Sequence, residues 1–526
     1  MTMNLYKRLF VVLAFVGIVS CDTLELDLQE NPDALTLASA DVDLVFNTIQ
    51  FNFRNQMTSL GYLSDGPMRM VNFFGTYNPG QGTMNGNWSQ IYNTGTNLDA
   101  LKSFSDNEGF TFHYGVAQIM QATMYVNIVD YIGTAVFTEA NKSGEFPNPG
   151  LDAGADIYTA MYDLIDEGIA NINGTGRAPL NDLYYGGDAA KWVAYANTLK
   201  LRMYLQTRLV NGTESTQGIN ALIGAGNLID QPEEDLQFQY GTTPTPIESR
   251  HPLFTGNYIN GAGAYMSNGL MSYMKDSMSV EDPRMKYYFY RQSDRSEANL
   301  IAADIIRCDG NPAYTFCTIG DFYYGRDHTD NEGIPGDANI RTTYGIYPAM
   351  GAFDEGNLIP ASQTSATGEG IAPLHLSSWT NFMLAESALT LGTTGSPATY
   401  LEAGMRQALQ KVRGFSPANM TTGQIDDYVN EVLAEYTAAS NTDKLDIITR
   451  EWYISSYTNG LLPYNTYRRT GFPSFLQDPI INAGAFVRSY FLPDSELNSN
   501  SNPDFATQKS ITDQVFWDTN PANFIN

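Results

Sequence analysis

The chain has 526 residues, enough for two or more domains or for one large helical body. Apolar residues make up 43% of it, so a sizeable core is expected, whereas charged residues make up only 16%, below the usual quarter. The formal net charge is −28, with 29 Lys and Arg against 57 Asp and Glu. This acidic balance argues against nucleic acid as a partner, because phosphate contacts require a basic surface.

The first 20 residues are typical of a signal peptide. Two basic residues precede an apolar run at 9–19 that is too short to span a bilayer. The run ends in Ile18-Val-Ser-Cys21, which is typical of a bacterial lipobox, so we expect Cys21 to be the lipidated first residue of the mature chain. The alternative is an ordinary secretory signal that ends near a Cys. No later run is apolar enough to predict a membrane helix.

Two further cysteines, Cys308 and Cys317, are close together in the sequence. An even pair in an exported chain predicts a local disulfide, worth roughly 2–3 kcal/mol for a loop this short. A zinc site is less favoured, because the spacing is wrong and the nearest histidine is His328.

Helical periodicity recurs along most of the chain. Residues 21–33 are acidic and are expected to form an extended tether, and residues 34–526 are expected to form one domain. Residues 229–262 are loop and strand-like. Helices are expected over 34–57, 110–132, 157–172, 188–210, 219–228, 263–275, 377–391, 398–413, 423–437 and 442–457.

A helix about six turns long is expected at 188–210, where apolar side chains recur at steps of three, four or seven. Asp188 is placed to cap its first turn. Asn211 and Gly212 are expected to end it, because both tolerate the left-handed conformation. We expect its outer side to carry the basic residues Lys191, Lys200, Arg202 and Arg208.

The Lys-Trp…Ala-Asn-x-Leu-Lys-Leu-Arg pattern at 191–202 resembles the central helix of the SusD/RagB family of nutrient-binding outer-membrane lipoproteins. Further blocks that resemble the family follow the expected order. These are the Asp-x-x-Gly turn at 129–140, Asp-Pro-Arg at 282–284, Arg-Arg-Thr-Gly-Phe-Pro within 467–473, and the closing pattern at 488–498. The resemblance covers nearly the whole mature chain.

The resemblance implies a mainly α fold. It would be a single SusD-like domain with tetratricopeptide-like helix pairs, long irregular loops and few short strands. The resemblance also implies a surface-exposed lipoprotein, anchored in the outer membrane through Cys21, that binds oligosaccharides or peptides. Its partner would be a SusC-like TonB-dependent transporter, which supplies the energy for import. The chain itself would not be an enzyme.

Two other classes of protein stay open. One is a structural subunit of an outer-membrane assembly with no ligand of its own. The other is a surface glycoside hydrolase, which needs two carboxyl groups about 5 Å or about 6.5–9.5 Å apart, a separation that a sequence does not report. The four histidines do not fall in a metalloprotease helix or beside a nucleophile elbow.

Two loops are the candidate ligand site, because sugars bind flat aromatic faces together with amide or Arg groups. We expect Tyr77 and Tyr324 to be exposed, so that replacing both with Ala abolishes ligand binding and leaves thermal stability unchanged. For Trp88, packing inside the protein is an equally good interpretation. The candidate residues are Arg69, Phe74, Tyr77, Asn78 and Trp88 in the first loop, and Tyr323, Tyr324 and Arg326 in the second.

The second loop is also rich in oxygen ligands, which suit calcium although their order differs from that of an EF-hand. The alternative is a loop organised by bonds from its carboxylates to backbone N–H groups and by pairing with Arg326. The candidate calcium ligands are Asp327, Asp330, Asn331, Glu332 and Asp337.

Overall fold

The computed structural model describes residues 41–261, 263–294, 308–332 and 336–526. The predicted signal peptide, the lipidated Cys21, the tether at 21–33 and the first residues of the helix predicted at 34–57 lie outside these ranges. The mainly α fold expected from the sequence is confirmed. Within the described residues, none of the helices combines the length and apolar character needed to cross a membrane.

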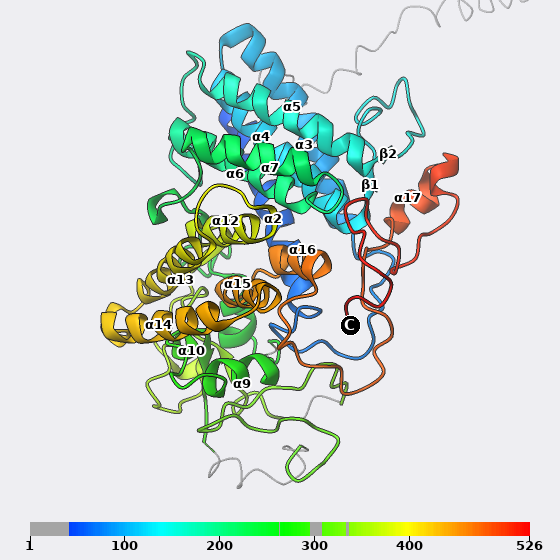
Figure 1. The fold of residues 1–526 in the computed structure, drawn as a ribbon. Coiled ribbons are helices and arrows are strands. Elements are labelled where there is room, and N and C mark those ends of the chain that lie inside the picture. Colours follow the sequence, from blue (N-terminus) through cyan, green and yellow to red (C-terminus); the bar gives the residue numbers. More distant parts are fainter. Residues whose placement is uncertain (1–40, 262, 295–307, 333–335) are drawn as a thin grey trace, which may run out of the picture.

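The first group of helices packs largely in sequence order, with α4 against α5 and α6 against α7 (Figure 1). Two glycines allow α4 and α5 to pack closely, because a Cβ added to Gly115 would lie 2.6 Å from the carbonyl oxygen of Gly168. The group consists of α2 (Val42–Asp65), α3 (Asn85–Glu108), α4 (Thr111–Ile132), α5 (Gly154–Ile172), α6 (Ala189–Gln206) and α7 (Gly212–Ala225).

The second group lies below the first in Figure 1, and α12 and α16 both contact helices of the first group. Ser396 caps α13, and Thr421 forms a capping box with Gln424 at the start of α14, so both helices begin where side chains satisfy their first N–H groups. The group consists of α12 (Ser377–Leu391), α13 (Pro397–Arg413), α14 (Thr422–Ala438), α15 (Asn441–Ser455) and α16 (Leu461–Thr470).

Loops and short elements form the lower end of the molecule in Figure 1 and much of its right side. The short helices are α8 (Pro252–Phe254), α9 (Asn268–Asp276), α10 (Met285–Tyr288) and α17 (Asp494–Ser499), with single turns η2 (Pro232–Glu234), η3 (Thr255–Ile259), η4 (Ala361–Gln363), η5 (Pro417–Asn419) and η6 (Pro503–Phe505). The antiparallel strand pairs are β1 (Thr134–Ala135) with β2 (Asp152–Ala153), β3 (Leu236–Gln239) with β6 (Ile371–His375), and β4 (Phe289–Tyr290) with β5 (Thr343–Tyr344). A disulfide joins Cys308 to Cys317.

The predicted end of the helix at 188–210 is wrong. Helix α6 stops at Gln206, and the Thr207 hydroxyl donates back to the Met203 carbonyl oxygen at 3.0 Å. Asn211 is instead the residue before α7, which starts at Gly212 and therefore begins earlier than the helix predicted at 219–228. Residues that tolerate irregular backbone mark a break between two helices. The sequence does not distinguish the end of the first helix from the start of the second.

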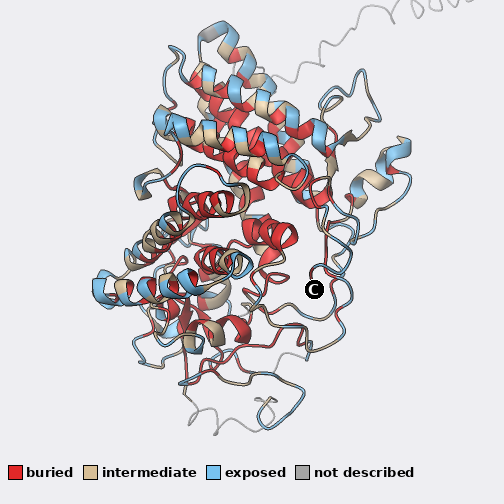
Figure 2. Ribbon diagram, viewed as in Figure 1, coloured by how far each residue is buried: buried red, intermediate tan, exposed pale blue. Residues whose placement is uncertain are grey.

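The core is centred on α4, which is buried along nearly its whole length (Figure 2). Its buried residues lie on every side of the helix and are mostly apolar, which is typical of a helix inside a protein rather than on its surface. Its one carboxylate, Asp130, is fully buried and accepts bonds from Arg202 at 2.8 Å, Trp517 at 3.0 Å and Asn465 at 2.8 Å.

The expected basic outer side of α6 is therefore only half right. The Lys200 ammonium pairs with the exposed Asp166 at 2.6 Å, but the Arg202 side chain is buried against α4. Arg208 pairs with the buried Glu386 of α12 at 3.0 Å. The reason is that α6 is covered by α4, α5, α7 and α12 together, so little of its circumference faces solvent.

Candidate functional site

The two loops predicted to form the ligand site lie side by side, although about 250 residues separate them. The loop junction is defined here as residues 66–84 together with residues 323–332. Phe74 forms a bridge with Thr329, and the Asn72 amide donates to the Asp330 carbonyl oxygen at 3.1 Å.

The aromatic residues of the loop junction are nevertheless buried, so the expectation that Tyr77 and Tyr324 are exposed is wrong. Tyr77 is 2% exposed and packs against Phe73, His328 and Phe486, and Tyr324 is 3% exposed and stacks on Phe322. Replacing both with Ala would create cavities, so an unchanged melting curve is no longer expected.

Arg69, Trp88 and Tyr323 are buried as well. The Arg69 guanidinium donates to the Gln477 carbonyl oxygen at 3.0 Å and to the Asn526 carbonyl oxygen at 2.5 Å, which fixes the C-terminal segment against the first loop. The Trp88 indole N–H donates to the Glu496 carboxylate at 3.1 Å. Trp88 therefore packs inside the protein, which is one of the two interpretations given for it above. These side chains hold segments together rather than face solvent.

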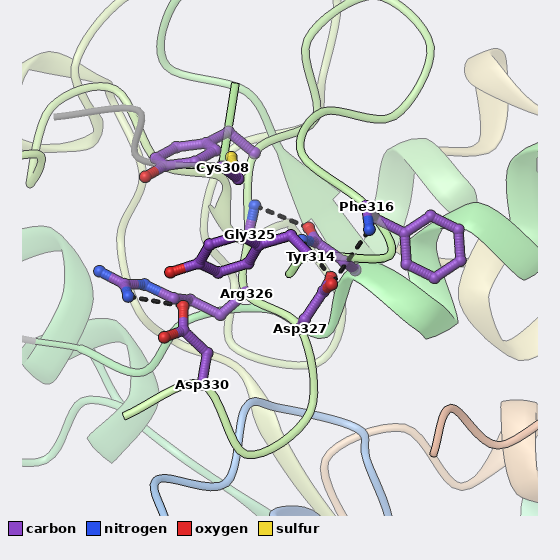
Figure 3. Close-up of a pocket in the computed structure, with 9 residues that line it drawn as sticks. Cys308, Tyr314, Phe316, Gly325, Arg326, Asp327 and Asp330 are labelled. Atoms are coloured by element: carbon purple, nitrogen blue, oxygen red, sulfur yellow. Dashed lines mark hydrogen bonds and ion pairs between the residues drawn. The ribbon is translucent and has the colours of Figure 1, made fainter. Parts of the chain in front are cut away.

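Arg326 is held in a buried stack with Tyr265 (Figure 3 shows its ion pair with Asp330). The Arg326 and Arg341 guanidinium carbons lie 4.5 and 4.7 Å from the centre of the Tyr265 ring. The Tyr265 hydroxyl donates to Asp337 at 2.7 Å, and Arg326 pairs with Asp330 at 2.7 Å. Arg326, Asp330 and Asp337 are therefore all bonded within the protein.

The structure does not gather the candidate calcium ligands around a common point. Asp327 accepts the backbone N–H groups of Thr315 and Phe316 at 2.6 and 3.0 Å, whereas Asp330 pairs with Arg326. Among the residues that the structure describes, no three His, Cys, Asp or Glu side chains are placed to hold one metal ion. The cavity behind these groups is about 10 Å³, the space of a single water (Figure 3). The alternative of a loop organised by its carboxylates fits these contacts.

The Tyr77 hydroxyl and the His328 Nε2 atom are 2.5 Å apart and join the two loops. Burial lowers the pKa of His328 to about 2 and raises the pKa of Tyr77 to about 12, so both groups are neutral at physiological pH.

We expect Tyr77→Phe to lower the free energy of unfolding by about 1–3 kcal/mol, because it leaves the buried imidazole without this partner. Urea unfolding measures the change, and Tyr400→Phe on α13 is the control, since the Tyr400 hydroxyl donates to the Thr394 carbonyl oxygen in an exposed setting. Equal stability losses in the two variants would contradict the role of the Tyr77–His328 bond.

Phe74 and Asn78 are the candidate residues of the loop junction whose side chains reach solvent. Phe74 is 46% exposed and meets Tyr265 edge-on, and Asn78 is exposed. Among the candidate residues of the loop junction, Phe74 is therefore the aromatic residue whose ring is exposed to solvent.

A groove of about 430 Å³ lies directly beside the loop junction and is called the Tyr273 groove. The rings of Tyr273 and Phe475 pack against each other in it, with centres 4.0 Å apart and planes inclined by 30°. Both rings and that of Phe316 are half-buried. The groove is lined by Gly269, Ser272, Tyr273, Asp276, Ser277, Thr315, Phe316, Phe475, Gln477 and Asp478.

The local sequence explains one wall of this groove. Ser267 caps α9 by accepting the Leu270 N–H, and the lining residues of α9 then recur at steps of three and four, which places them on one helix face. Gly269 is required here, because a Cβ at this position would lie 2.9 Å from the Cβ of Gln477.

Residues of the loop junction hold the other walls of the groove in place through hydrogen bonds to Phe316 and Gln477. Asp327 accepts the Phe316 N–H while the Phe316 ring points away from the carboxylate (Figure 3). The Gln477 side-chain oxygen accepts the His328 N–H at 2.9 Å. The second predicted loop thus contributes support for the groove, whereas the groove's own rings were not among the residues predicted.

Sequence reasoning missed Tyr273, Phe316 and Phe475. Tyr273 falls within the helix predicted at 263–275, where a polar face of Ser and Asp around one aromatic ring was the available signal. Phe475 closely follows the Arg-Arg-Thr-Gly-Phe-Pro block, and Phe316 precedes the disulfide-bonded Cys317.

The fold and the groove define a mainly helical protein whose loops form a ligand-sized aromatic groove. Residues 27–304 and 342–491 match a SusD-like family described as starch-binding and associating with the outer membrane. Because this match covers most of the sequence, the chain belongs to the SusD-like family. No curated protein matches the chain.

Solved structures share this fold at low sequence identity. One described as a chitin-binding protein is 20% identical with a TM-score of 0.68, and the alignment covers 91% of this chain and 99% of that one. A chitin-binding SusD homolog from Flavobacterium johnsoniae is 17% identical with a TM-score of 0.64, covering 91% and 100%. A SusD homolog from Bacteroides uniformis is 17% identical with a TM-score of 0.66, covering 91% and 99%.

Proposed function

We propose that this protein binds a neutral oligosaccharide in the Tyr273 groove and passes it to a SusC-like TonB-dependent transporter. The observation that carries the proposal is the tilted, half-buried ring pair of Tyr273 and Phe475 in an open groove. Aromatic faces pack on the C–H groups of sugar rings, and polar groups around them bind the hydroxyls.

The lining of the groove provides those polar groups. Gln477, Ser272 and Ser277 offer amide and hydroxyl groups, and the side-chain nitrogen of Gln477 is buried without a hydrogen-bond partner among the described residues. Asp276 and Asp478 are the charged side chains of the lining, and no Lys or Arg accompanies them. This charge disfavours anionic glycans. The volume lies within the range of about 300–1,000 Å³ that is usual for ligand sites.

The family membership supports an outer-membrane role, since the family description itself names starch binding and that membrane. The lipobox ending at Cys21 supports lipid anchoring and, with the family resemblance, exposure at the cell surface. The relatives described as chitin-binding support a glycan over a peptide.

Binding without catalysis is part of the proposal. The histidines His113, His251, His328 and His375 are all buried and line neither the Tyr273 groove nor its rim. Burial lowers the pKa of each, to about 3 for His251 and His375, so these imidazoles are poor proton carriers near neutral pH.

The test is a calorimetric titration of the lipid-free protein with chitohexaose and with maltoheptaose. Replacing Tyr273 and Phe475 with Ala is expected to weaken binding at least tenfold, because both stacking faces are lost. Tyr400→Ala is the control, as a half-buried tyrosine on α13 outside the groove.

The outcomes separate the alternatives. Unchanged affinity in the double variant contradicts the Tyr273 groove, and a loss caused by Phe74→Ala instead places the ligand on the loop junction. Binding of peptides but neither oligosaccharide favours a peptide carrier. Release of shortened sugars by the purified protein favours the hydrolase alternative, and a lack of any ligand favours the structural subunit.

A further inference from the structure

A second large groove lies among the loops that follow β5 and is called the Phe353 groove. Its volume is about 620 Å³. It adjoins a hollow of about 400 Å³, and the two share Phe353, Glu355 and Asn419 in their linings. The linings of the groove and of its adjoining hollow have no residue in common with the Tyr273 groove or the loop junction.

The Phe353 groove combines an apolar floor with polar walls. Ile346, Met350, Phe353 and Ile359 provide the apolar surface, and the half-buried Phe353 ring rests edge-on against Tyr287 with centres 4.8 Å apart. The polar wall residues are Asn357, Gln363, Thr364, Ser365, Thr367, Ser416 and Asn419.

Several of these wall side chains have unused hydrogen-bonding capacity. The side chains of Gln363, Ser365 and Thr367 are solvent-exposed or at the rim and bond to no other described residue. A polyhydroxylated ligand requires an apolar floor beside hydroxyl or amide groups that are free to bond to it, and this groove has both.

The walls are fixed before any ligand arrives. The Gly368 N–H donates to the Met350 carbonyl oxygen at 3.1 Å, and the Tyr290 hydroxyl donates to the Ile359 carbonyl oxygen at 2.9 Å. The backbone of Met350 has a φ of 54°, which is unusual for a residue with a side chain of this size. The surrounding hydrogen bonds maintain this conformation. A groove that is already shaped loses less entropy when a ligand binds.

Charge and backbone pairing select the class of ligand. The lining of the Phe353 groove holds the carboxylates of Glu355 and Glu369 and no Lys or Arg, which disfavours anionic ligands. A peptide that binds as an added strand needs a free sheet edge, and the chain after β5 is already bridged between Gly345 and Ala352. A neutral oligosaccharide satisfies both conditions.

We propose that the Phe353 groove is a second oligosaccharide-binding site, for another segment of the same neutral glycan. This inference rests on the proposed function. Two sites on one protein make the second contact with a long polysaccharide intramolecular, so a polymer is held more tightly than a short oligomer.

The experiment is a calorimetric titration of the full lipid-free protein with chitohexaose and with maltoheptaose. The expected stoichiometry is two oligosaccharides per protein, falling to one in Phe353→Ala. The double variant Gln363→Ala with Thr367→Ala, which changes exposed side chains only, is expected to weaken one of the two sites at least fivefold. Its control is Thr213→Ala with Gln217→Ala, an exposed pair on α7 outside both grooves.

Each result is decisive. One bound oligosaccharide in the wild type, lost only in the Tyr273 groove variants, overturns the second site and leaves the proposed function intact. A second binding event that persists in both Phe353 groove variants also overturns it. Binding of neither oligosaccharide at any site overturns both proposals. Titration with anionic oligogalacturonate is expected to show no binding at the Phe353 groove, and equal affinity there contradicts the argument from charge.

Discussion

Arg202→Ala is expected to lower the free energy of unfolding by about 3–5 kcal/mol, because it leaves Asp130 buried without its charged partner. The two charged groups are 2.8 Å apart, and their side chains are 7% and 0% exposed. Asp130 also accepts bonds from Tyr158 at 2.5 Å and Trp517 at 3.0 Å, so the same change disturbs contacts with α5 and the C-terminal segment.

The matched control is Lys200→Ala on the same helix. Lys200 pairs with Asp166 at 2.6 Å, but the Asp166 side chain is 63% exposed, so a loss of about 0–1 kcal/mol is expected. Urea unfolding followed by tryptophan fluorescence measures both changes. Similar losses for Arg202→Ala and Lys200→Ala would contradict the buried ion pair as a main support of the helix packing.

The second large effect is a pH dependence that comes from Asp65, the last residue of α2. Its carboxyl group is buried and accepts the Gly460 N–H at 2.8 Å. Burial raises its pKa from 3.8 to about 8, so the folded protein retains a proton that the unfolded chain releases.

The sign follows from this proton. Stability attributable to Asp65 is fully present below pH 3.8 and is lost as the pH rises toward about 8. The loss is on the order of 1.4 kcal/mol per pH unit within that window, or several kcal/mol in total.

Asp65→Asn removes this proton and should flatten the pH profile. Unfolding free energies of both proteins at pH 5 and pH 8 give the comparison, because all other titrating groups contribute equally to the two. The wild type is expected to lose several kcal/mol more than the Asn variant between these pH values. A difference between the two proteins that stays constant with pH would contradict the raised pKa.

The helical fold was predictable because helix patterns are local. The helix expected at 377–391 is observed as α12 with the same bounds, and that expected at 398–413 is observed as α13, one residue longer. The blocks that suggested the family also have a physical role. Arg284 of Asp-Pro-Arg pairs with Asp282 and Glu451, and Arg469 of the later block pairs with Glu386, so these residues tie distant helices together inside the core.

The candidate site was predictable only in part, because exposure depends on segments that are remote in sequence. Nothing local shows that Phe486 covers Tyr77 or that Arg202 faces a carboxylate on α4. The Tyr273 groove is likewise assembled from three separate segments, around 269–277, 315–316 and 475–478. The contact between the two predicted loops supports this groove, while its aromatic surface lies on neighbouring residues.

The most direct test of glycan binding is a crystal structure of the protein with bound chitohexaose or maltoheptaose. We expect electron density for a sugar ring packed on Tyr273 and Phe475, with hydroxyls bonded to Gln477 and Asp276. Density confined to Phe74 and Asn78, or a complex with no sugar in the Tyr273 groove, would contradict the assignment of this groove as the primary binding site.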